Sequence, residues 1–273
     1  MTLSTTPGKK SKGSKLKRIG SAALVAAFWI AVWEGLYYLV NQDILIASPQ
    51  AVIARGAQLI VTSEFWMTAG LSLYRILIGY LIAVAAGVVV AVATSASKIV
   101  YSLLYPIISI LRVTPVASFI ILALVWISAG AVPSLMAGII VLPIVWANVS
   151  EGIAQTDIQL LEMARMYRFS RLKIFRRIYI PSVAPYFTTA CMTGLGMAWK
   201  AGIAAEVLSV PKLAIGTNIY DAKRYIETAD LFFWTLVVII LSMILEKLVR
   251  LAVKQIMRRV IGGGQPDGAE TRI

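Results

Sequence analysis

Six basic side chains lie within thirteen consecutive residues near the middle of this 273-residue chain, at Arg165, Arg168, Arg171, Lys173, Arg176 and Arg177. Clustered guanidinium and ammonium groups bind carboxylates, phosphates and lipid headgroups through charge-assisted hydrogen bonds. The cluster lies between two long apolar stretches and is followed by Pro181. These residue types therefore indicate electrostatic binding, either to a lipid surface or to a partner protein.

The sequence offers few residues for catalytic chemistry. It holds no histidine and a single cysteine, Cys191, which lies in an apolar run. Imidazole bases, histidine metal ligands, Ser-His triads and disulfide frameworks are therefore excluded. No cluster of aspartates and no nucleophile beside a base stands out, which disfavours a membrane enzyme such as a lipid transferase. We expect no catalytic residue, no metal site and no cofactor bound by this chain.

The composition indicates a membrane protein. Hydrophobic residues make up 59% of the chain, charged residues 14%, and the mean hydropathy is +0.81. Soluble domains carry about 25% charged residues, so much of this surface faces lipid. The formal net charge of +13 could indicate a nucleic-acid partner. The charges instead flank apolar runs, which favours the lipid bilayer as the environment and no nucleic acid as partner.

A membrane-crossing helix needs about 20 mostly apolar residues. The sequence predicts an all-α membrane protein with six transmembrane helices, at about residues 20–40, 69–94, 103–127, 132–149, 183–206 and 231–251. The first apolar run exceeds the 7–15 residues typical of a signal peptide, so we expect it to be retained as a helix. Pro106, Pro115 and Pro143 are expected to bend their spans.

Lys and Arg in short loops mark the cytoplasmic side of a membrane protein. With both termini in the cytoplasm, only Arg55, Lys212, Lys223 and Arg224 lie in outer segments, and most other basic residues lie inside. We therefore expect a basic cytoplasmic tail at 1–19, a permease-type transmembrane domain at 20–260 and a disordered cytoplasmic tail at 261–273.

Two outer segments carry their own signals. Residues 41–68 are expected to form a short amphipathic segment along the surface, with a helix starting at Ser48 and Pro49. Residues 207–230 balance basic and acidic side chains, and this loop could face a partner.

The basic cluster belongs to a predicted cytoplasmic loop, residues 151–182. Gln155 to Tyr167 reads as one short helix with apolar positions near helical spacing. Ser170 is expected to cap a second helix that Pro181 breaks. Two short helices with an apolar and a basic face would form a compact projection from the membrane. The simplest alternative is an orientation signal whose arginines only touch lipid headgroups.

The spacing in this loop resembles the EAA loop of ABC importer permeases. That pattern is Glu-Ala-Ala, three residues, Gly, nine residues and Ile-x-Leu-Pro. Here residues 162–164 read Glu-Met-Ala, Arg168 holds the glycine position, and Ile178, Ile180 and Pro181 complete the pattern. Met163 and Arg168 are departures, and glycine at the latter position would allow a left-handed backbone. The resemblance implies an ATPase-coupling loop formed by Glu162, Ala164, Arg168, Phe169, Ser170, Arg171, Ile178 and Pro181.

Residues 30–260 resemble permeases of the nitrate, sulfonate and taurine importer group, through the runs IASPQAVIARGAQLI, AWKAGIAAEVL and ADLFFWTLVVIILSMILEKLV. The resemblance implies a type I ABC importer permease fold in the bacterial cytoplasmic membrane. It also implies a permease homodimer, a separate ATPase subunit that binds the ATP, and an extracytoplasmic solute-binding protein. A secondary transporter that is not driven by ATP is the alternative.

Polar and ionisable residues inside spans are candidates for the translocation pathway. Those in this sequence are Arg112, Thr114, Asn148, Trp199, Lys200 and Glu206, and Arg75 also lies within a span. Lys200 and Glu206 are six residues apart, about 240° around a helix, so either is expected to pair with another helix instead. The basic residues suit an anionic solute of the nitrate, sulfonate or taurine kind. A neutral or cationic solute, such as a thiamine-precursor pyrimidine, is the alternative.

Overall fold

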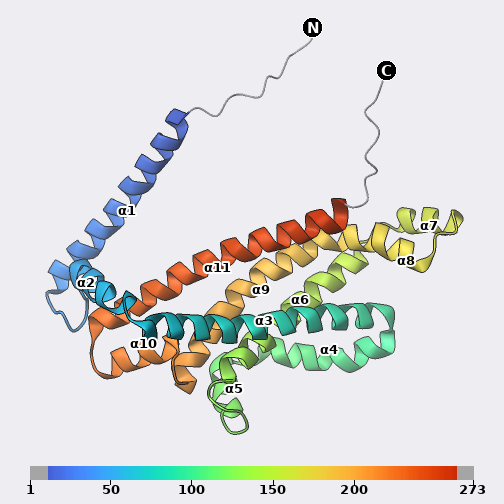
Figure 1. Cartoon of the computed structure of the whole chain (residues 1–273). Coiled ribbons are helices and arrows are strands. Elements are labelled where there is room, and N and C mark those ends of the chain that lie inside the picture. The colour runs from blue at the N-terminus through green and yellow to red at the C-terminus, as the bar shows by residue number, and fades with distance from the viewer. Residues whose placement is uncertain (1–11, 263–273) are drawn as a thin grey trace.

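The computed structural model describes residues 12–262, and within them the chain is helical with no strand (Figure 1). The first half holds α1 (Lys12–Val40), α2 (Pro49–Ile60), α3 (Ser63–Ala96), α4 (Lys98–Val113), α5 (Val116–Ala123) and α6 (Val132–Ala154). The second half holds α7 (Ile158–Met166), α8 (Arg171–Ile174), the π-helical turn η1 (Phe175–Tyr179), α9 (Ile180–Ser209), α10 (Ile215–Arg224) and α11 (Thr228–Gly262). The expected all-α class is confirmed.

The centre of the molecule is α6, which packs along both α3 and α9. Gly79 of α3 permits this approach, because a Cβ there would collide with the backbone of Ser134 on α6. The hydroxyl of Ser134 donates to the carbonyl of Arg75 at the same crossing, at 2.6 Å. Small residues that bring helix backbones together are typical of packing within membranes, where apolar burial alone gives little driving force.

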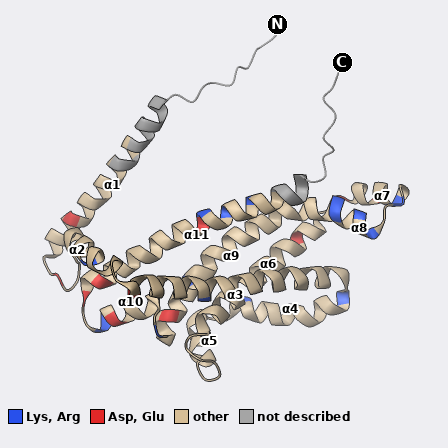
Figure 2. Ribbon diagram, in the orientation of Figure 1, with Lys and Arg blue, Asp and Glu red and all other residues tan. Residues whose placement is uncertain are grey.

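The two ends of the helical bundle differ (Figures 1 and 2). At one end, α2 and α10 lie against α11, and we refer to it as the α2–α10 end. At the other, α7 and α8 project beyond α6 and α9, and we refer to it as the α7–α8 end. Helix α1 leans away from the bundle and is joined to it near α2.

Two helix starts follow the local sequence. Ser48 accepts a hydrogen bond from the backbone N–H of Ala51 and caps α2, with Pro49 in the first turn, which confirms the predicted start. Ser170 likewise accepts from the N–H of Lys173 and caps α8, as predicted. Both caps depend only on neighbouring residues, so they could be predicted from the sequence.

The predicted third span is broken. Helices α4 and α5 meet at Thr114 and Pro115 with a bend of 104°, because proline disfavours a helical residue before it. Pro106 and Pro143, also expected to bend their spans, lie inside α4 and α6, which run through them.

Two helices of the described chain, α3 and α6, are long and apolar enough to cross a membrane, and the bent α4–α5 pair could be a third span. The other three predicted spans fall on α1, α9 and α11, and the six-span count stays a prediction.

The helix boundaries around the basic cluster correct two expectations. Helix α7 begins at Ile158 rather than Gln155, because Gln155 still ends α6. The path from Arg171 through η1 into α9 is continuous, so Pro181 does not break it. Proline is tolerated in the first turn of a helix, and here it follows a π-helical turn that changes the local hydrogen-bond register.

The predicted tails lie largely outside the described residues. Of the basic tail 1–19, residues 12–19 belong to α1, and 1–11 are not described. Of the tail 261–273, all but the last residues of α11 also lie outside.

Candidate functional site

Helix α7 is short, and residues at its two ends satisfy its free backbone groups. The carboxylate of Asp157 accepts a hydrogen bond from the N–H of Gln159 at 2.8 Å and caps the start. Ala164 is fully buried, while Glu162 is exposed. The small side chain at position 164 lets the following turn fold back against the helix.

The turn after α7 is a Schellman motif centred on Arg168. The N–H of Phe169 donates to the carbonyl of Ala164, and the N–H of Arg168 donates to the carbonyl of Arg165, both at 2.9 Å. Arg168 has φ of 49°, so it adopts the left-handed conformation that glycine would occupy in the resembled pattern. The backbone of the family turn is therefore kept despite the arginine.

Phe169 packs within the loop itself. Its ring lies 6.5 Å from that of Tyr167, and the ammonium of Lys173 sits 3.8 Å from the ring centroid. Such a cation–π contact holds a half-buried aromatic side chain in place. Of the two roles open to Phe169, a partner's anchor or internal packing, the structure shows the internal contacts.

Large apolar side chains are exposed around this turn. Ile158, Met166, Tyr167 and Leu172 are 70%, 84%, 73% and 66% exposed. Together with the exposed Glu162, Arg168 and Arg171 they form what we call the α7–α8 surface. Clustered exposed apolar residues rimmed by charge mark interaction sites. The apolar periodicity had suggested a face packed within the loop, whereas α7 makes few contacts with any other helix.

The α7–α8 surface is joined directly to a long helix. Ile178 in η1 is buried, and Pro181 stands in the first turn of α9. Since α8, η1 and α9 follow one another without a break, a continuous helical path joins the turn at Arg168 to α9.

Two of the six predicted pathway residues share a hollow between α9 and α11. Trp199 and Lys200 line it with Ser242 and Glu246, and its volume is about 290 Å³. The indole N–H of Trp199 donates to the carbonyl of Val238 at 3.2 Å, and the Lys200 side chain is exposed. If α9 crosses the membrane as predicted, this exposed ammonium group needs water, a solute or a partner rather than lipid around it.

The remaining pathway candidates lie apart from this hollow. Arg112 and Thr114 are at the bend between α4 and α5, where the Thr114 hydroxyl donates to the carbonyl of Ile110. Asn148 lies on α6, and its amide donates to the carbonyl of Ile144 in the same helix. The structure does not bring these three together with Lys200.

Glu206 lies in the interior of the chain near the α2–α10 end and is fully buried. One carboxylate oxygen accepts from the hydroxyl of Ser72 at 2.9 Å and from the N–H of Gly216 at 3.1 Å. The other oxygen lies 3.9 Å from the guanidinium of Arg75, which also donates to the carbonyls of Lys212 and Leu213.

Glu206 therefore pairs with another helix, as expected, and not with Lys200. Its contacts tie α9 to α3 and to the start of α10. No motif or spacing points to Ser72 or Gly216, because helix packing rather than spacing makes both of them partners of Glu206.

Comparison with known proteins shows which family and which named proteins this chain resembles. Residues 83–262 match the family described as binding-protein-dependent transport system inner membrane component. SsuC of Bacillus subtilis, which carries the name of an aliphatic sulfonates transport permease protein, is 23% identical over 254 residues, covering 92% of this chain and 91% of SsuC. NrtB of Synechococcus elongatus, a nitrate import permease protein, is 29% identical over 222 residues, covering 77% of this chain and 79% of NrtB.

A solved structure of the MetNI methionine ABC transporter in inward-facing conformations matches with a TM-score of 0.49 and 19% identity, covering 71% of this chain and 93% of that chain. The family match alone spans well over half of the sequence. The chain therefore belongs to the family of binding-protein-dependent transport system inner membrane components and is a permease subunit of an ABC importer.

Proposed function

We propose that this permease carries a small anion of the nitrate, sulfonate or bicarbonate kind across the bacterial cytoplasmic membrane. The observation that carries the proposal is the exposed Lys200 in the hollow between α9 and α11. The ammonium group of Lys200 offers an entering anion a charge partner, and a partly enclosed hollow screens that attraction less than open water does. Relatives of this chain are named for sulfonate, nitrate and bicarbonate, and all three are anions.

The energy comes from a separate ATPase subunit that holds the ATP and docks on the α7–α8 surface. The exposed apolar side chains of that surface and the flanking Glu162 and Arg171 support this role. ATP binding would move the turn at Arg168, and the continuous path into α9 would carry this motion to Lys200.

Three further elements complete the proposal. A solute-binding protein delivers the anion at the α2–α10 end, which faces the outside, and both termini lie in the cytoplasm. Two copies of the permease enclose the pathway, with six spans each. Arg112, Thr114 and Asn148 contribute to the pathway from α4 and α6, and Trp199 shapes the hollow beside Lys200.

Uptake measurements in the host test the solute and the role of Lys200 together. Cells would be offered radiolabelled nitrate, an alkanesulfonate and bicarbonate, with a neutral pyrimidine as the alternative solute. We expect ATP-dependent uptake of one anion, and Lys200→Gln should lower it about tenfold, the effect of losing one charge contact of about 1.4 kcal/mol. Lys254→Gln, at an exposed lysine of α11 that belongs neither to the hollow nor to the α7–α8 surface, is the matched control and should leave uptake unchanged.

Two outcomes would contradict the proposal. Unchanged anion uptake in Lys200→Gln would remove Lys200 from the pathway. Uptake that persists after ATP is depleted, while the ion gradients are maintained, would indicate a secondary transporter.

A further inference from the structure

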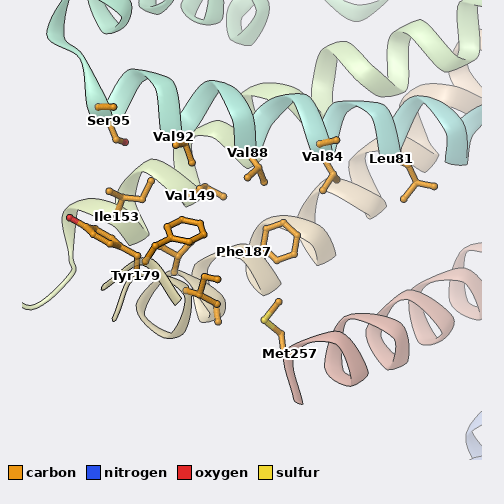
Figure 3. A pocket seen from close by; sticks show the side chains of 16 residues that line it. Leu81, Val84, Val88, Val92, Ser95, Val149, Ile153, Tyr179, Phe187 and Met257 are labelled. Atoms are coloured by element: carbon orange, nitrogen blue, oxygen red, sulfur yellow. The ribbon is translucent and has the colours of Figure 1, made fainter. Parts of the chain in front are cut away.

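An apolar groove of about 590 Å³ runs along α3 on the side that faces α6, η1 and α9 (Figure 3). One face of α3 lines it through Leu81, Val84, Ala85, Val88 and Val92. Val149 and Ile153 of α6, Phe187 of α9 and Met257 of α11 close the other sides. The groove is separate from the hollow at Lys200 and touches the segment after the α7–α8 surface through η1.

The groove has a polar end. Ser95 and Tyr179 line it at the α7–α8 end of α3, while Leu81 lies far along the helix toward the middle of the bundle (Figure 3). Two exposed cations are near this end in the chain. Lys98 starts α4, three residues beyond Ser95, and Arg176 directly follows the lining residue Phe175 in η1. An occupant that suits the groove is apolar for most of its length and anionic at one end.

The length of the groove suits an acyl chain. Leu81 and Ser95 are fourteen residues apart, which at about 1.5 Å per residue is about 21 Å. That length exceeds the hydrocarbon half-thickness of a bilayer, about 15 Å, so the groove is long enough for an acyl chain that reaches the headgroup level.

We propose that this groove binds an acyl chain of an anionic phospholipid, whose phosphate lies against Lys98 and Arg176. The apolar walls take the chain, and the hydroxyls of Ser95 and Tyr179 meet the glycerol ester region. The bound chain contacts Phe175 and Tyr179 in η1, the π-helical turn that joins the α7–α8 surface to α9. A lipid at this position therefore supports the segment through which the proposed coupling motion passes.

Retention of lipid by the purified full chain tests the proposal. The protein would be placed in nanodiscs of phosphatidylglycerol and phosphatidylcholine, extracted in mild detergent, and the retained phospholipid measured by mass spectrometry. We expect about one phosphatidylglycerol per chain and little phosphatidylcholine, because each cation near an anionic headgroup favours it about fivefold.

Two groove-filling variants and one control separate the groove from the lipid-facing surface. Ala85→Phe and Val92→Phe place a ring in the groove at exposed positions, and displacing two or three methylene groups should lower retained phosphatidylglycerol at least about tenfold. Val89→Phe adds the same kind of ring at a 66% exposed position outside the groove and should retain lipid like the wild type. Thermal unfolding in detergent checks that all three variants are folded.

The charges are tested separately. Lys98→Gln with Arg176→Gln should abolish the preference for phosphatidylglycerol over phosphatidylcholine while a chain is still retained. The proposal is overturned if folded Ala85→Phe and Val92→Phe both retain lipid like Val89→Phe, or if the wild type shows no headgroup preference. It is also overturned if a cysteine placed at Val88 and a second cysteine introduced into α1 form a disulfide between two copies, which would make the groove an interface between copies.

Discussion

Two turns at opposite ends of the molecule share one backbone design. After α7, the turn reads Tyr167-Arg168-Phe169, and after α10 it reads Tyr225-Ile226-Glu227. In the second turn the N–H of Glu227 donates to the carbonyl of Ala222 and that of Ile226 to the carbonyl of Lys223, the pattern seen around Arg168. Each turn places a residue with a side chain in the left-handed region, with φ of 49° at Arg168 and 61° at Ile226.

The surroundings of the two turns differ. The turn at Ile226 is tied to the bundle, because Arg55 of α2 pairs with Asp230 through bonds of 2.6 and 3.0 Å and Thr228 donates to the carbonyl of Ile44. The hydrogen bond to Asp230 raises the pKa of Arg55, so the guanidinium stays charged. The turn at Arg168 has no comparable tie in the described chain, since α7 makes few contacts with other helices. The same turn geometry is thus held against the bundle at Ile226 and stands on an exposed surface at Arg168.

The largest expected effect is a loss of stability when Glu206, near the α2–α10 end, is replaced. Glu206→Ala leaves Ser72, Arg75 and the start of α10 without their shared acceptor, and it should lower the free energy of unfolding by about 3 kcal/mol. Glu206→Gln keeps the shape and should lose less. Thermal and denaturant unfolding in detergent would measure both.

Glu246→Ala is the control for that change, because Glu246 pairs with Arg250 at the surface of α11. An exposed pair of this spacing contributes about 0.5 kcal/mol or less. Equal losses in the free energy of unfolding for Glu206→Ala and Glu246→Ala would show that Glu206 does not hold α9 to α3 and α10.

The next prediction compares the same substitution in the two turns, at Tyr167 and at Tyr225. Tyr167 and Tyr225 occupy the same position in their turns and are 73% and 64% exposed, so aspartate at either should leave stability almost unchanged. Tyr167→Asp removes an apolar contact from the proposed ATPase surface and should lower transport more than tenfold, as loss of an interface hot spot does. Tyr225→Asp, at the opposite end, should leave the ATPase subunit bound as in the wild type, measured by co-purification, whereas Tyr167→Asp should lose it. Equal retention of the ATPase by the two variants would remove the functional difference between the turns.

The smallest expected effect concerns the strain that the turns share. A residue with a Cβ in the left-handed region costs about 1 kcal/mol, and a β-branched one costs more. Ile226→Gly should therefore raise the free energy of unfolding by about 1 kcal/mol, and Arg168→Gly by somewhat less, measured by the same unfolding assays. Destabilisation by both changes would mean that the arginine and isoleucine side chains stabilise the turns through contacts that outweigh the strain.

Features set by neighbouring residues could be predicted from the sequence, and features set by packing could not. The caps at Ser48 and Ser170, the break at Pro115 and the turn at Arg168 all depend on a few adjacent residues. The predicted break at Pro181 was wrong, because the effect of a proline depends on where the helix begins. Pro181 lies in the first turn of α9, and η1 leads into that helix without a break.

The candidate sites show the same division. The spacing from Glu162 to Pro181 predicts a coupling loop, but helical periodicity could not tell that Met166 stays exposed for want of a packing partner. Lys200 stood out as a charge in an apolar run, whereas its neighbours Ser242 and Glu246 come from α11 and meet it only in the folded chain.

The central claim is that the α7–α8 surface binds a separate ATPase subunit. The most direct measurement is purification of the tagged full chain from its host in mild detergent, with mass spectrometry of the proteins that co-elute. Glu162→Arg would be compared with the wild type and with Glu227→Arg, which reverses an exposed charge at the opposite end. The account predicts that an ATPase subunit co-elutes with the wild type and Glu227→Arg and is lost with Glu162→Arg. An ATPase retained equally by all three, or absent from the wild type in several detergents, would contradict it.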